Sequence, residues 1–187
     1  MRKVVLIVTA AVATAAPAVA LADSSSAQSS AEKQCRTERT QMGSATFKST
    51  FGTGKSKNAF GQCVSHRTQQ NKADEGKSLT SAEQQCRAQQ SDSTFVATHA
   101  GKTFDQFYGS NHNGKDAFGK CVSSTARSMT ESAENQQVQS EVSAAKQCQS
   151  MQTTDATTFK TTYGTKPNAF GKCVSQTAHQ LEQQGSS

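Results

Sequence analysis

The sequence predicts an all-α protein made of three small helical repeats, each with one disulfide inside it, joined by polar linkers. Two observations carry this prediction: one pattern of cysteine, aromatic residues and glycine occurs three times, and its apolar residues fall at helical spacing. A third observation concerns composition. Beyond residue 22, Leu, Ile, Val and Phe number 17 of 165 residues, below the roughly 20% under which chains tend to be disordered. One conventional core is therefore excluded, and we expect three miniature cores.

Residues 1–22 are typical of a secretory signal peptide. Arg2 and Lys3 supply positive charge, a short apolar run follows, and residues 20–22 (Ala-Leu-Ala) fit the small-x-small rule for cleavage. The alternative, a membrane anchor, is disfavoured because the run is short and Pro17 interrupts it. We expect a secreted, extracellular protein without a membrane span after cleavage. In that mature chain, lysine and arginine outnumber aspartate and glutamate by four.

The three copies of the pattern define the expected domains. Each copy opens with a Ser-Ala block that ends in Cys, continues with two aromatic residues four apart and a Gly, and closes with an Asn/Asp-Ala-Phe-Gly-x-Cys-Val-Ser block. The opening cysteines are 51 and then 62 residues apart, and this uneven spacing favours tethered modules over a regular solenoid. The expected organisation is a flexible N-terminus at 23–29, repeat 1 at 30–70, a linker at 71–80, repeat 2 at 81–130, a polar linker or helix at 131–142, repeat 3 at 143–184 and a tail at 185–187.

Each repeat is expected to fold as three short helices. The opening serines are good N-caps, the paired aromatics share one helix face, and the Gly after each pair suits a left-handed helix end. The last helix begins at an Asn or Asp cap and keeps a Gly in its first turn. Such a Gly costs about 1 kcal/mol, which predicts a close approach by another backbone or aromatic ring. The opening serines are Ser30, Ser81 and Ser143, and the glycines after the aromatic pairs are Gly52, Gly109 and Gly164. The caps of the last helices are Asn58, Asp116 and Asn168, and the glycines in their first turns are Gly61, Gly119 and Gly171.

Six cysteines lie beyond the leader, and we expect them to form three disulfides. An even number of cysteines in a secreted chain with a poor core is typical of a disulfide framework. Every repeat has one cysteine on its first helix and one on its last, so the expected pairs are Cys35–Cys63, Cys86–Cys121 and Cys148–Cys173. Each pair would add roughly 3–4 kcal/mol by restricting the unfolded chain. The alternative, a zinc site, is disfavoured because no C-x-x-C occurs and no histidine recurs beside the cysteines. No metal is expected.

Motifs for catalysis are not found in the sequence. The four histidines occupy no equivalent positions in two repeats and have no partner at triad or metal-site spacing; they are His66, His99, His112 and His179. No G-x-S-x-G motif occurs, and the Gly-Lys-Ser triplets at 54–56 and 76–78 lack the earlier glycine of a phosphate-binding loop. We expect neither enzyme activity nor a cofactor.

Lysines in the loop before each last helix are the candidate binding residues. Each of these loops leads into a helix N-terminus, where free amides and the helix dipole favour anions. The candidate anion-binding residues are Lys55, Lys57, Lys115 and Lys166. Three such loops would allow the chain to bind an anionic polymer at several points. The alternative is that these are ordinary solvated lysines.

The closing block, at 58–65, 116–123 and 168–175, follows a Phe-x-x-x-Phe/Tyr-Gly motif in every copy. This combination resembles a repeat of secreted proteins of high-GC Gram-positive bacteria, and the Ala-rich leader is similar in style. These proteins are uncharacterised, with no known activity. The resemblance therefore implies no functional residue.

We expect a secreted, non-enzymatic repeat protein with a structural or binding role. One form of that role is multivalent attachment to an anionic cell-surface or extracellular polymer, such as a wall polymer. Specific recognition of nucleic acid is not expected, because the charge is mild and interspersed. The sequence leaves one alternative open, an inhibitor of an extracellular enzyme, since small disulfide modules in series present rigid loops.

Overall fold

The computed structural model describes residues 24–52, 58–111 and 113–185, and within these residues the protein is all-helical. The expected signal peptide at 1–22 and the candidate residues Lys55 and Lys57 lie outside the described residues. No described helix is apolar over enough of its length to span a lipid bilayer. The helices are α1 (Ser24–Met42), α2 (Ser44–Phe51), α3 (Ala59–Ser91), α4 (Phe95–Thr98), α5 (Phe104–Tyr108), α6 (Ala117–Thr154), α7 (Ala156–Tyr163) and α8 (Ala169–Gly185).

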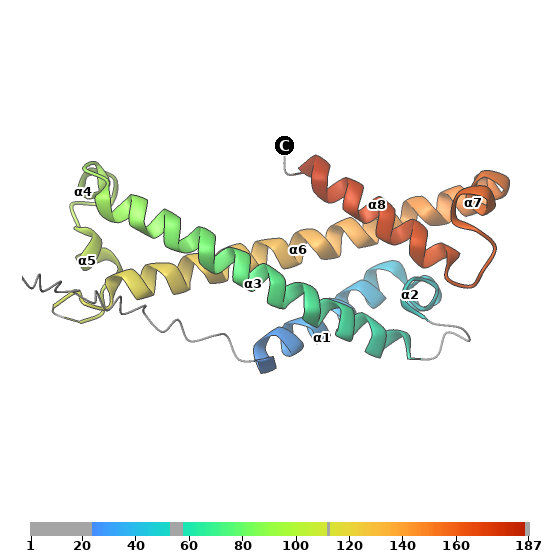
Figure 1. Cartoon of the computed structure of the whole chain (residues 1–187), viewed down its shortest axis with the longest axis horizontal. Helices are drawn as coiled ribbons and strands as arrows, with labels where there is room; N and C mark the ends of the chain where they lie inside the picture. The colour runs from blue at the N-terminus through green and yellow to red at the C-terminus, as the bar shows by residue number, and fades with distance from the viewer. Residues whose placement is uncertain (1–23, 53–57, 112, 186–187) are drawn as a thin grey trace, which may run out of the picture.

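Two long helices, α3 and α6, organise the molecule. They have 33 and 38 residues and pack against each other. Figure 1 shows an elongated arrangement in which α2 and α7 lie at one end of the pair and α4 and α5 at the other. At the α2 and α7 end, α1 packs on α3 and α8 packs on α6.

The segment expected as a linker, 71–80, is helical and lies inside α3, and 131–142, expected as a polar linker or helix, is helical and lies inside α6. Neither segment contains Pro, and both are rich in residues with good helix propensity, so the helix continues through them. Gly76 does not interrupt α3, because its cost of about 1 kcal/mol is small against the packing of a long helix. The predicted N-caps were wrong: Ser81 and Ser143 lie within α3 and α6, and Ser30 lies within α1.

The described residues form two core clusters, where three were expected. The first cluster joins residues of the first and third expected repeats, including Phe47, Phe159 and Phe170. It also contains the disulfides of these two repeats, Cys35–Cys63 and Cys148–Cys173. The second contains Phe95, Phe104 and the disulfide of the middle segment. The expectation of three separate cores was wrong because α1, α2 and the start of α3 pack against the second half of α6 and α8. Pooling the two sets of apolar residues removes more surface from water than two separate cores would.

The three disulfides pair as the sequence predicts. Each bridge joins two helices, and all six cysteines are fully buried. Cys35–Cys63 joins α1 to α3, Cys86–Cys121 joins α3 to α6, and Cys148–Cys173 joins α6 to α8. The aromatic pairs also share one face as expected, with ring centroids 4.9, 5.0 and 5.2 Å apart in α2, α5 and α7. The crosslinks thus connect α1 to α8 through the two long helices.

The ends of the short aromatic helices fall where the sequence predicts, but their geometry differs. α2, α5 and α7 end before Gly52, Gly109 and Gly164. The predicted left-handed conformation was wrong for Gly52 and Gly109, whose φ values are −73° and −70°. Gly164 has a φ of 93° with a ψ of −177°, so it is strained for other residues but is not left-handed helical. In all three cases the chain leaves the helix in an extended direction.

The glycines in the first turn of the last helices do not share one role. A Cβ on Gly171 would lie 2.6 Å from the carbonyl oxygen of Thr50, so here the predicted close approach exists, between α2 and α8. A Cβ on Gly61 would clash with the side chain of Asn58, the N-cap residue of the same helix. A Cβ on Gly119 would have no described atom within 4 Å beyond its chain neighbours and its own helix backbone. The close approach predicted there was wrong.

Candidate functional site

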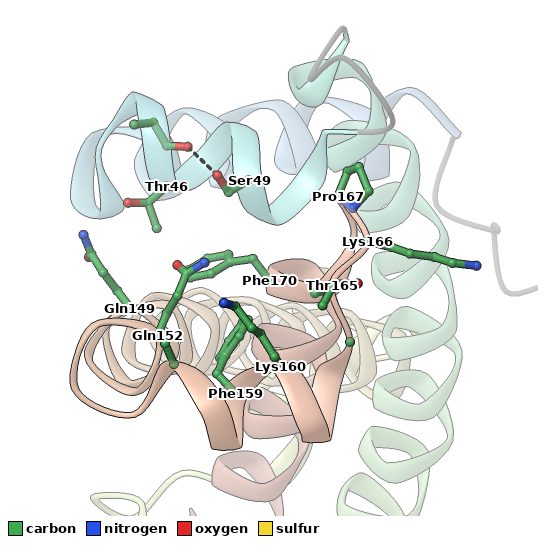
Figure 2. Close-up of a pocket in the computed structure, with 14 residues that line it drawn as sticks. Thr46, Ser49, Gln149, Gln152, Phe159, Lys160, Thr165, Lys166, Pro167 and Phe170 are labelled. Carbon is green, nitrogen blue, oxygen red and sulfur yellow. Dashed lines mark hydrogen bonds between the residues drawn. The ribbon is translucent and has the colours of Figure 1, made fainter.

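A groove lies between α2 and α7, at the end of the molecule where the first and third expected repeats meet. Its cavity volume is about 420 Å³. Its walls come from α2, the end of α6, α7 and the loop before α8 (Figure 2). The polar and charged residues that line it are Thr46, Ser49, Gln149, Gln152, Lys160, Thr165 and Lys166.

The charge of this groove is positive. Lys160 and Lys166 line it, and none of its lining residues within the described part of the chain is acidic. Figure 2 shows Lys160 and Gln152 pointing into the space between α7 and α2, whereas the side chain of Lys166 points away from it. Gln149, Gln152 and Lys160 make no side-chain hydrogen bond or ion pair with other described residues. Their donors are therefore available to a ligand.

The wall that carries Lys160 is held in place by local structure. Asp155 caps α7, and its Oδ1 accepts a hydrogen bond of 3.0 Å from the backbone N–H of Thr158. Hydrogen bonds from Thr158 lower the pKa of Asp155, so this carboxylate stays ionised and committed to the cap. Phe159 and Phe170 are buried beneath the groove, 3% and 7% exposed. α7 therefore presents Lys160 from a fixed position.

The candidate lysines of the sequence analysis do not converge on one site. Lys166 lines the groove between α2 and α7. Lys115 lies in the loop between α5 and α6, at the other end of the molecule (Figure 1). The structure adds Lys160, which sequence reasoning missed. The available signal was a Thr-Phe-Lys triplet shared by the first and third copies, at 46–48 and 158–160, where the second copy has Thr-Phe-Asp.

A buried cluster of charged residues lies between α1, α3 and α6, and sequence reasoning missed it as well. Arg67 of α3 pairs with Glu38 of α1 and, at 2.9 Å from Nη2 to Oε2, with Glu141 of α6. Arg67 and Glu38 are fully buried and Glu141 is 8% exposed. Nη1 of Arg67 also donates to Gln70 and Gln137, at 3.1 Å each. We call Glu38, Arg67 and Glu141 the buried ionic cluster.

Burial favours the protonated form of Glu38. Burial raises the pKa of Glu38 to about 8, because its attraction to Arg67 only partly offsets the loss of hydration. Burial also raises the pKa of Glu141. Oε2 of Glu38 lies 3.3 Å from Sγ of Cys63. A disulfide sulfur carries no hydrogen, so in this contact the protonated carboxyl is the donor.

Cys35, Glu38 and Cys63 bring their donor atoms within 4.8 Å of one another, as the ligands of a metal ion would. The two sulfurs are bonded to each other, however, and a disulfide does not supply the thiolates that bind metals. Arg67 adds a cation beside the same carboxyl. This group therefore does not fit a metal site in the oxidised protein.

The fold defines an all-helical protein crosslinked by three disulfides, with a basic groove at one end. No protein-family model, no curated protein and no solved structure matches the chain.

Proposed function

We propose that this is a secreted, non-enzymatic binding protein whose groove between α2 and α7 holds a segment of an anionic cell-surface or extracellular polymer. One observation carries the proposal: a cavity of about 420 Å³ into which Lys160 points and whose described lining residues include no acidic one. Ligand sites commonly have volumes of about 300–1,000 Å³. A lysine ammonium without a protein partner attracts an anionic group of the ligand.

The remaining lining residues favour a polymer of sugars or polyols that carries phosphate or carboxylate groups. Gln149, Gln152 and Thr46 supply amide and hydroxyl groups that hydrogen-bond to ligand hydroxyls. A single-stranded nucleic acid would need exposed aromatic rings on which its bases stack. The two rings at this groove, Phe159 and Phe170, are buried. The groove chemistry therefore suits an anionic glycan or polyol phosphate better.

The three-repeat organisation with one disulfide in each copy is part of this proposal. The first and third copies together supply the groove, with Thr46 from one and Lys160 from the other. The middle copy leaves Lys115 at the opposite end of the molecule, where it provides a second point of attachment. The three buried disulfides suit an oxidising, extracellular setting.

The proposal is tested by binding of the mature chain to a purified polyol-phosphate polymer, with neutral dextran and single-stranded DNA as comparisons. We expect Lys160→Ala to weaken binding of the polyol phosphate about fivefold at low salt, since one exposed charge contributes about 1 kcal/mol. Lys77→Ala is the matched control, because this lysine lies on α3 away from the groove and its side chain is 79% exposed. Equal binding by both variants, or equal binding of dextran, contradicts the proposal. Tighter, Lys160-dependent binding of DNA would reject the glycan or polyol class.

A further inference from the structure

Exposed arginines lie beside half-buried phenylalanine rings in the first and second copies. Cζ of Arg36 and Cζ of Arg39, on α1, lie 5.7 and 5.8 Å from the ring centroid of Phe60 at the start of α3. Cζ of Arg87, near the end of α3, lies 5.3 Å from the ring centroid of Phe118 at the start of α6. These are cation–π distances, and such a contact holds a guanidinium in place without using its N–H donors. We call the two groups the first-copy and second-copy arginine clusters.

The donors of these arginines have no protein partner among the described residues. Arg36, Arg39 and Arg87 make no side-chain hydrogen bond or ion pair there, whereas Arg67 makes both. Arg36 and Arg87 each follow a glutamate by four residues, a spacing at which helical ion pairs form, yet neither ion pair is present. These guanidinium groups lie by a ring rather than by a carboxylate, so their donors are available to an anion.

The same positions of the repeat line the groove in the third copy. Arg36 and Arg39 stand one and four residues after the opening cysteine of the first copy, and the third copy has Gln149 and Gln152 at these places. Both glutamines line the groove together with Phe170, the phenylalanine of the third closing block. One face of the repeat, between its first helix and its closing block, therefore lines a cavity in the third copy and carries unpaired guanidinium groups in the first.

We propose that the two arginine clusters are oxyanion sites, which bind phosphate or carboxylate groups of an acidic polymer outside the groove. A guanidinium presents parallel N–H donors that match the oxygens of either group, and a ring contact fixes its position before the ligand arrives. The first-copy cluster has one more positive charge and should bind about fivefold more tightly at low salt. The choice of a polymer as ligand rests on the proposed function, whereas the two sites do not depend on the groove.

The proposal differs from a purely structural role of the cation–π contacts in what it predicts for other arginines. If the rings only anchor these side chains to the fold, an added polyanion would be attracted to every exposed arginine alike. Arg127, on α6, is exposed and has no ring at cation–π distance among the described residues. It therefore measures the general attraction between the polyanion and a positive side chain.

The test is a titration of the full oxidised mature chain at low salt, followed by NMR through the Nε–Hε resonances of its arginines. The probes are a short polyol-phosphate oligomer and an oligogalacturonate with the same number of charges, so the tighter probe identifies the oxyanion. We expect saturable shifts at Arg36, Arg39 and Arg87, and only a small, non-saturating shift at Arg127. Equal shifts at Arg127, or no saturable shift with either probe, overturn the proposal.

Arg39→Lys provides the matched variant, because it keeps the charge and loses the planar fork of donors. We expect it to weaken the binding reported by Arg36 about fivefold and to leave the titration of Arg87 unchanged. Binding equal to the wild type would overturn recognition by the guanidinium fork. The wild-type titration decides the proposal even if this variant fails to fold.

Lys160→Ala separates these sites from the groove. We expect it to leave the titrations of Arg36, Arg39 and Arg87 unchanged, whatever it does to binding in the groove. Loss of their shifts in this variant would overturn the proposal, because the arginines would then report occupancy of the groove. Saturable shifts that persist while the groove binds nothing would support the arginine sites and reject the groove alone.

Discussion

Stability of this protein should decrease as the pH rises through the weakly acidic and neutral range, and Glu38 is the main cause. Its pKa is about 8 in the folded protein and 4.5 as a model value, so between these values the folded state holds a proton that the unfolded state has released. The contribution is fully present below pH 4.5 and is lost as the pH rises through 8. A difference of 3.5 pKa units corresponds to about 5 kcal/mol.

The assay is denaturant unfolding of the oxidised mature chain at pH 4.5, 6.5 and 8.5, followed by circular dichroism. We expect Glu38→Gln to match the wild type at pH 4.5 and to exceed its free energy of unfolding by several kcal/mol at pH 8.5. Burial lowers the pKa of His66, so stability from that residue is lost as the pH falls below 6.5, but both proteins contain His66 and its contribution cancels in the difference between them. Parallel pH profiles for the two proteins would refute a neutral Glu38 in the folded state.

Two further predictions concern packing. Phe159→Ala should lower the free energy of unfolding by about 3–5 kcal/mol in thermal denaturation, because the ring is 3% exposed. Phe107→Ala is its control and should cost less than about 1 kcal/mol, since that ring is 46% exposed; equal losses would contradict the core assignment. Gly171→Ala should destabilise the protein, because the new Cβ would lie 2.6 Å from the Thr50 carbonyl oxygen. Gly119→Ala should stabilise it by up to about 1 kcal/mol, because the new Cβ would have no described atom within 4 Å beyond its chain neighbours and its own helix backbone. Equal thermal midpoints for these two glycine variants would count against the contact between α2 and α8.

Local spacing was sufficient to predict the helical class, the disulfide pairs and the aromatic pairs. Cys35 and Cys63 belong to one copy of a pattern, and their pairing follows from the position of each on its own helix. The aromatic pairs need only the i, i+4 relation within one helix. A helix at 131–142, now inside α6, was one of the two expectations for that segment, and the continuous helix α3 could have been predicted too, because the segment at 71–80 contains no Pro.

The groove and the buried ionic cluster could not be predicted in the same way, because both depend on helices that are distant in the sequence. Lys160 faces α2 only because the first and third copies share a core, and nothing in their spacing indicates that contact. Arg67 follows Cys63 by four residues and so lies on the buried face of its helix. A charged residue on that face indicates a buried partner, but not that the partners are Glu38 and Glu141.

The order of the crosslinks has a mechanical consequence. Because the disulfides join α1 to α3, α3 to α6 and α6 to α8, a force applied between the chain ends passes across the S–S bonds and bypasses the three enclosed loops. The bridged cysteines are 28, 35 and 25 residues apart, and each pair of Cα atoms is 6.0 Å apart. At about 3.4 Å per extended residue, the 35-residue loop would span about 110 Å more if its disulfide did not hold its ends together. Reduction would therefore turn a short, stiff tether into a much longer one without breaking the polypeptide.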